Sequence, residues 1–68
     1  MINELLKQWE ELQNVPTDRN PAKIQDKAKR EITIAESLVH EGYDGKLNGF
    51  SLQFIIDDRR RAISHMNN

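Results

Sequence analysis

The run from Ser51 to Met66 constrains this chain more than any other stretch of its sequence. At helical spacing its apolar side chains fall on one face, which is the pattern of an amphipathic helix packed on a core. These residues are Leu52, Ile55, Ile56, Ala62, Ile63 and Met66. Arg59 falls in the middle of the same face. A guanidinium there has to reach solvent, pair with an acid or meet a second molecule, so Arg59 raises the main functional question.

The chain has 68 residues, which we interpret as a single small helical domain spanning residues 1–68. A chain of this size buries only about 60% of the surface that its unfolded form exposes. It has no cysteine, so neither a disulfide nor a cysteine zinc site can supplement its core. Self-association is the stabiliser most available to it, and we therefore expect a homo-oligomer.

Location is also constrained by composition. The sequence has no cysteine, no signal-peptide pattern and no apolar run near 18 residues. Together these features predict a soluble cytoplasmic protein with no membrane contact.

A short amphipathic helix is predicted at the N-terminus, over about residues 2–14. Its apolar residues recur at intervals of three and four, and Pro16 ends it because the residue before a proline disfavours helix. Trp9 lies at helical spacing from Leu5 and Leu12, which favours a place in the core.

A second helix is predicted over residues 21–40. Asn20 can cap its free amides, Pro21 suits its first position, and Gly42 is a natural stop. Its expected buried stripe is Ile24, Ala28, Ile32, Ala35, Leu38 and Val39. Ile34 lies off that stripe, so it is either a lone surface residue or a subunit contact.

Two interpretations compete for the residues after the glycine-rich loop at 42–50. Asn48-Gly49 suits a two-residue hairpin turn, and the residues from Phe50 to Ile56 alternate like a strand. The helical stripe persists for longer, and Ser51 can cap it, so we favour a helix over about residues 51–66. The predicted fold is all-α: three short helices (about 2–14, 21–40 and 51–66), the second and third antiparallel, with a loop that is alternatively the start of a β-hairpin.

Catalytic and metal chemistry find little support. Asp44, Asn48 and Gly49 match a calcium loop at three positions, but Lys46 and Ile55 stand where the ion needs oxygen ligands. Glu36 and His40 are too few ligands for a metal site. No serine has a base at a suggestive spacing, so we expect no enzyme activity, no catalytic residue, no metal and no cofactor.

Basic residues give a more specific lead, although the net charge is only −1. If the second and third helices are antiparallel, the start of one should lie beside the end of the other. That would gather Lys23, Lys27, Arg30, Arg59, Arg60 and Arg61 at one pole, where they could bind phosphates. Against this, Asp26–Arg30 and Asp57–Arg61 have the i,i+4 spacing of ordinary surface ion pairs.

The function that we expect is therefore a small intracellular interaction protein that acts by stoichiometric binding, as an accessory, regulatory or inhibitory factor of a size class typical of bacteria and their phages. Its expected partners are a second copy of itself and another protein, and its expected oligomer contacts are Ile34, Phe54 and Arg59. The alternative is an anion-binding module that uses the basic pole to hold phosphates of a nucleotide or nucleic acid.

Overall fold

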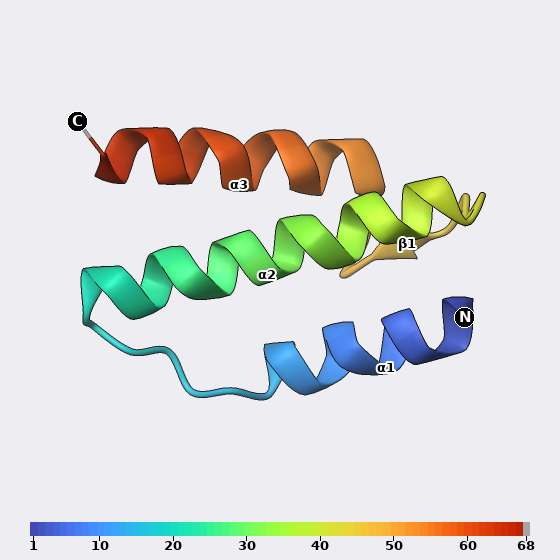
Figure 1. The fold of residues 1–68 in the computed structure, drawn as a ribbon, viewed down its shortest axis with the longest axis horizontal. Coiled ribbons are helices and arrows are strands. Elements are labelled where there is room, and N and C mark those ends of the chain that lie inside the picture. Colours follow the sequence, from blue (N-terminus) through green and yellow to red (C-terminus); the bar gives the residue numbers. More distant parts are fainter. Residues whose placement is uncertain (68) are drawn as a thin grey trace.

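Three helices, with a short hairpin between the second and third, make up the computed structural model, which describes residues 1–67 (Figure 1). The elements are α1 (Ile2–Gln13), α2 (Pro21–His40), β1 (Lys46–Leu47), β2 (Phe50–Ser51) and α3 (Leu52–Met66). The predicted all-α fold is confirmed, and each helix begins and ends within one residue of its predicted bounds.

The ends of α2 are set by local side chains and backbone. The side chain of Asn20 accepts a hydrogen bond of 2.9 Å from the amide of Ala22, and Pro21 occupies the first turn. At the other end the amide of Gly42 lies 3.0 Å from the carbonyl of Val39, and Gly42 itself takes a φ of +80°, which turns the following residue back toward the helix. The amide of Tyr43 then reaches the carbonyl of Leu38, also at 3.0 Å, which completes a Schellman motif.

Both interpretations of residues 46–56 hold, for different parts of the segment. Asn48 and Gly49 adopt φ values of +53° and +84°, so they form the tight turn that joins β1 to β2. The strands end after two residues each, because Ser51 caps α3 by accepting a bond of 3.2 Å from the amide of Phe54. The segment is a hairpin as far as Ser51 and a helix from Leu52.

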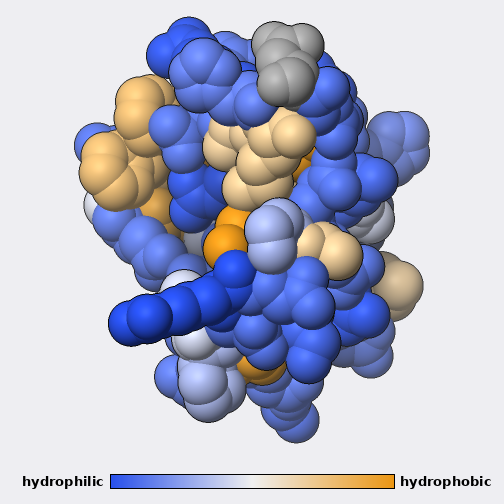
Figure 2. Space-filling view, turned by 90° about the vertical axis from the view of Figure 1, so that its left-hand side faces the viewer, coloured by the Kyte–Doolittle hydropathy of each residue, from blue (hydrophilic) through white to orange (hydrophobic). Residues whose placement is uncertain are grey.

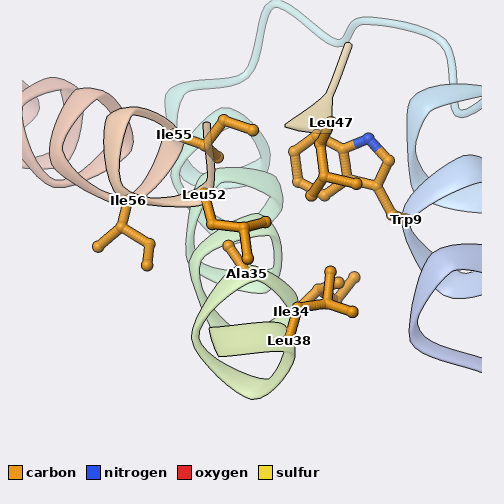
Figure 3. Close-up of a cluster of buried hydrophobic side chains, with 8 residues drawn as sticks. All are labelled: Trp9, Ile34, Ala35, Leu38, Leu47, Leu52, Ile55 and Ile56. Atoms are coloured by element: carbon orange, nitrogen blue, oxygen red, sulfur yellow. The ribbon is translucent and has the colours of Figure 1, made fainter. Parts of the chain in front are cut away.

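The helices form an open array with α2 in the middle. Helix α3 lies antiparallel along one side of α2, and α1 lies along the other side (Figure 1). Within residues 1–67, the backbones of α1 and α3 do not come into contact with each other. The hairpin lies on one face of this array, and its Leu47 packs beside Trp9 between α1 and α3 (Figure 3).

The hydrophobic core contains side chains from all three helices and from the hairpin (Figure 3). Its buried members are Trp9, Ile34, Ala35, Leu38, Leu47, Leu52, Ile55 and Ile56. Trp9 is only 4% exposed, which confirms its predicted place in the core.

The core also corrects the prediction for Ile34. This side chain is buried on the side of α2 that faces α1, so it is not a surface residue available to a second subunit. The prediction was wrong because it gave α2 one buried stripe, whereas a central helix needs two. Val39, which was assigned to the buried stripe, is instead half exposed.

An open array leaves much surface uncovered. The chain exposes 5059 Å², whereas a monomeric protein of 7.9 kDa is expected to expose about 4,400 Å². Its radius of gyration is 11.9 Å, about 1 Å more than the usual value for this length. Within residues 1–67, none of the helices combines the length and apolar character that a bilayer crossing requires.

Candidate functional site

A groove runs over α2 between α1 and α3, on the face of the array that carries the hairpin. It consists of two adjoining hollows that share Asp58 and Arg59. The hairpin hollow, of about 280 Å³, is lined by Trp9, Leu47, Asn48, Phe50, Phe54, Ile55, Asp58 and Arg59. The larger open hollow, of about 810 Å³, extends toward the start of α2 and includes Ile24, Ala28, Ala62 and Met66. Figure 2, viewed from that end, shows apolar side chains in separate groups with hydrophilic ones around them.

Arg59 meets an internal acid at the junction of the two hollows. Its Nε lies 3.2 Å from Oε1 of Glu31, and its Nη2 lies 3.4 Å from Oε2 of the same carboxylate. Its Nη1 donates to Asp58 on the same helix. Glu31 is only 5% exposed, so α2 buries a charge that needs this partner. The sequence left open whether Arg59 would pair within the chain, and the structure resolves that question in favour of an internal pair.

Glu31 was missed as a site residue, although the sequence contained a signal for it. It lies three residues after Ala28 and four before Ala35, and both alanines are buried. An acid at that spacing falls within the apolar stripe of α2, just as Arg59 falls within that of α3. Two opposite charges on facing apolar stripes are expected to pair.

The ion pair is part of a longer chain of hydrogen bonds. Gln13 donates to Glu31 Oε2 at 2.9 Å, and Asn48 donates to Gln13 Oε1 at 3.2 Å. One polar network therefore joins α1, α2, α3 and the hairpin turn. Burial alone would lower the pKa of Arg59, but the hydrogen bonds and charges of Glu31 and Asp58 outweigh it and raise that pKa above its usual value.

The indole of Trp9 leaves one polar atom unsatisfied. Its Nε1 is buried and has no hydrogen-bond acceptor among the described residues. A buried donor without a partner costs roughly 1–3 kcal/mol. Because the ring lines the hairpin hollow, anything that covers this hollow lies close to the only tryptophan in the chain.

Two phenylalanines, one from β2 and one from α3, line the hairpin hollow. The rings of Phe50 and Phe54 are stacked with their centroids 4.8 Å apart and their planes at 17°. They are 52% and 50% exposed. A stacked aromatic pair with half its surface in water is an apolar feature that a binding partner would cover. We call the surface formed by Phe50, Phe54 and the outer side of α3 the phenylalanine face.

The predicted basic pole is only partly assembled. Lys23, Lys27, Arg30 and Arg59 all line the open hollow. Arg60 instead pairs with Glu36 at 2.7 Å, on a later turn of α2. All three arginines were predicted to lie beside the start of α2. They do not, because Arg59 is only the eighth residue of α3 and lies opposite the middle of α2. The end of α3 reaches that start, where Gln25 donates to Asn67 at 2.8 Å.

Acids neutralise the hollow that these bases line. Asp18 lies 3.3 Å from Lys23, and Asp26 lies 3.0 Å from Arg30, so the predicted Asp26–Arg30 pair is confirmed. Asp18, Asp26, Glu31 and Asp58 match the four bases in number. No group of three His, Asp or Glu side chains with metal-binding geometry occurs within residues 1–67.

The predicted Asp57–Arg61 pair does not form, although the structure describes both residues. Asp57 accepts a hydrogen bond of 3.0 Å from Gln53, one turn earlier in α3. Arg61 is exposed and forms no ion pair with any residue in the described part of the chain. Two opposite charges on the outer side of α3 are therefore left without an ionic partner among residues 1–67.

Comparisons of this chain with protein-family models, with curated proteins and with solved structures find no match.

Proposed function

We propose that this chain is a small intracellular interaction protein that acts by stoichiometric binding rather than by turnover, and that it binds protein through the phenylalanine face. The proposal rests on one observation above all, the stacked and half-exposed pair of Phe50 and Phe54. Aromatic anchors next to a hollow are typical of the residues that contribute most to protein–protein binding.

The surroundings of the pair support this role. The hairpin hollow beside the two rings gives a partner side chain a place to insert, and its floor is apolar, with Trp9, Leu47 and Ile55. The hairpin turn and the Arg59–Glu31 pair hold the walls in place, so little ordering cost remains to be met on binding. An accessory, regulatory or inhibitory factor needs a surface of this kind and no catalytic group.

The test compares substitutions at side chains of similar exposure. Phe50→Ser with Phe54→Ser removes the pair, whereas Val39→Ser removes an apolar side chain that is 49% exposed on α2. Each tagged variant is used to capture protein from extracts of the source cells, and the protein retained is identified by mass spectrometry and titrated by calorimetry. We expect wild type and Val39→Ser to retain the same protein, at a whole-number ratio of that protein to this chain. The variant with both Phe50→Ser and Phe54→Ser should lose it. Equal retention by all three variants would contradict it.

A second candidate is an anion-binding module. One observation favours it, namely that Lys23, Lys27, Arg30 and Arg59 line a single hollow. The four acids in the same hollow weaken this candidate, because they leave little net positive potential for a phosphate. It predicts a thermal shift with nucleotides or short nucleic acids at low salt that shrinks steeply as salt is added. The absence of any shift across such a panel would remove it.

A further inference from the structure

The outer side of α3 carries its charges in an order that complements itself. Phe54, Asp57 and Arg61 are spaced three and four residues apart, so they share one exposed side of the helix, with the acid before the base. When two copies of a helix pack antiparallel, the early part of each faces the late part of the other. Position 59 is midway between Asp57 and Arg61. A two-fold axis that crosses the outer side of α3 at that level would set Asp57 of each copy across from Arg61 of the other.

We propose that the protein bound by the phenylalanine face is a second copy of this chain, related by such a two-fold axis, with the two α3 helices antiparallel and with two reciprocal Asp57–Arg61 pairs. This inference rests on the proposed function, since it names the partner of the same face. An isologous interface needs a patch that is complementary to itself, and this patch is.

The charges involved are free to make these contacts. Lys23, Arg30 and Arg60 each have an acid within the chain. Asp57 has only the amide of Gln53, and Arg61 has no ionic partner in residues 1–67. Pairing between copies would give both groups a partner without breaking any ion pair that the single chain makes.

The excess of exposed surface on this chain is close to the area that one bound partner would cover. The chain exposes about 650 Å² more than a monomer of its mass is expected to expose. Each partner in a standard interface buries about 800 Å². Pairing through α3 would also cover the rings of Phe50 and Phe54, which are the largest apolar side chains in reach of the axis.

Charge reversal tests this arrangement, because complementary variants should rescue each other. Asp57→Arg leaves a base at both position 57 and position 61, and Arg61→Asp leaves an acid at both. Sedimentation equilibrium of the purified full chain should show a dimer for wild type and, for each variant alone, a dimer at least about tenfold weaker, since like charges then face each other. An equimolar mixture of the two variants should form a dimer again, because each opposing pair then joins an acid to a base. Lys7→Glu, an exposed charge reversal on α1, is the matched control and should dimerise like wild type.

Three outcomes would overturn the inference. The first is a wild-type chain that stays monomeric at high micromolar concentration. The second is single variants that dimerise as tightly as wild type, and the third is a mixture that does no better than its components. Rescue in the mixture also shows that both variants are folded. If the purified chain is monomeric while capture of another protein still depends on Phe50 and Phe54, the second copy is excluded and the proposed function stands.

Discussion

The guanidinium of Arg59 and the carboxylate of Glu31 face each other side-on across the α2–α3 interface, 28 residues apart in the sequence, with contacts of 3.2 and 3.4 Å. Glu31 is buried, whereas the Arg59 side chain keeps 28% of its surface exposed in the groove. The pair allows α2 to carry a buried acid without leaving its charge unpaired. It also fixes the point at which the two hollows of the groove meet.

Removing the arginine alone should therefore be costly. Arg59→Ala leaves the Glu31 carboxylate buried with only Gln13 as a donor, and breaking a buried pair in this way costs about 3 kcal/mol of unfolding free energy. Replacing both partners with apolar residues, Arg59→Met with Glu31→Leu, should restore most of that loss. Urea unfolding of the single and double variants measures both values. A loss below about 1 kcal/mol for Arg59→Ala would show that the pair behaves like an exposed one.

The stability that this pair provides should not change with pH in the neutral range. The pKa of Arg59 is raised in the folded chain, since Glu31 and Asp58 outweigh the effect of its burial. A raised pKa stabilises the fold at every pH below the unfolded value, and this contribution is lost only as pH rises through the folded value. Both values lie far above neutrality, so the difference in unfolding free energy between wild type and the double variant Arg59→Met with Glu31→Leu, which removes both charges, should be constant from about pH 6 to pH 10. A difference that falls by more than about 1 kcal/mol across that range would contradict the assignment.

Trp9 provides a separate test of the hairpin hollow. Trp9→Ala should cost about 3–5 kcal/mol, as expected for a large buried aromatic side chain. Trp9→Phe should cost much less, because it keeps a ring against Leu47 and removes an indole N–H that has no acceptor among the described residues. Chemical denaturation measures both variants. Equal losses for the two would contradict this expectation.

Helix bounds were predictable because the signals that set them are local. The Asn20 cap, Pro21 and the Gly42 stop act on the backbone of their immediate neighbours. Their effect on the helix ends therefore does not depend on how the helices pack. The hairpin and α3 were treated as alternatives, although Asn48-Gly49 and Ser51 act on consecutive segments. Each of those signals was correct for its own few residues.

The groove was less predictable because it depends on which helix packs where. Nothing within α2 shows that α1 lies against the side that carries Ile34, so burial of that residue had no local signal. The conflict at Arg59 was visible in the sequence, but its resolution required the register of α3 on α2. That register sets Arg59 beside Glu31 and Arg60 beside Glu36, away from the lysines at the start of α2.

The hairpin turn makes two separable contributions to stability. Gly49→Ala puts a side chain at a φ of +84° and should cost about 1–2 kcal/mol. Asn48→Gly keeps a positive φ accessible but removes the donor to Gln13, an exposed bond, and should cost about 1 kcal/mol or less. Thermal unfolding followed by circular dichroism distinguishes the two variants. If Gly49→Ala unfolded like wild type, the turn in solution would not be the one described.

A last pair of substitutions separates folding from assembly on α2. Ile34→Ala removes a side chain that is 8% exposed and should lower the unfolding free energy by about 2–4 kcal/mol, because it leaves a cavity between α1 and α2. Val39→Ala removes one that is 49% exposed, five residues further on, and should change that energy by less than about 0.5 kcal/mol. Neither residue belongs to the phenylalanine face, so sedimentation at a temperature where both variants are folded should show wild-type self-association. If Ile34→Ala instead weakened self-association and left stability unchanged, Ile34 would be the subunit contact that its position off the single predicted stripe indicated, and α1 would not cover it in solution.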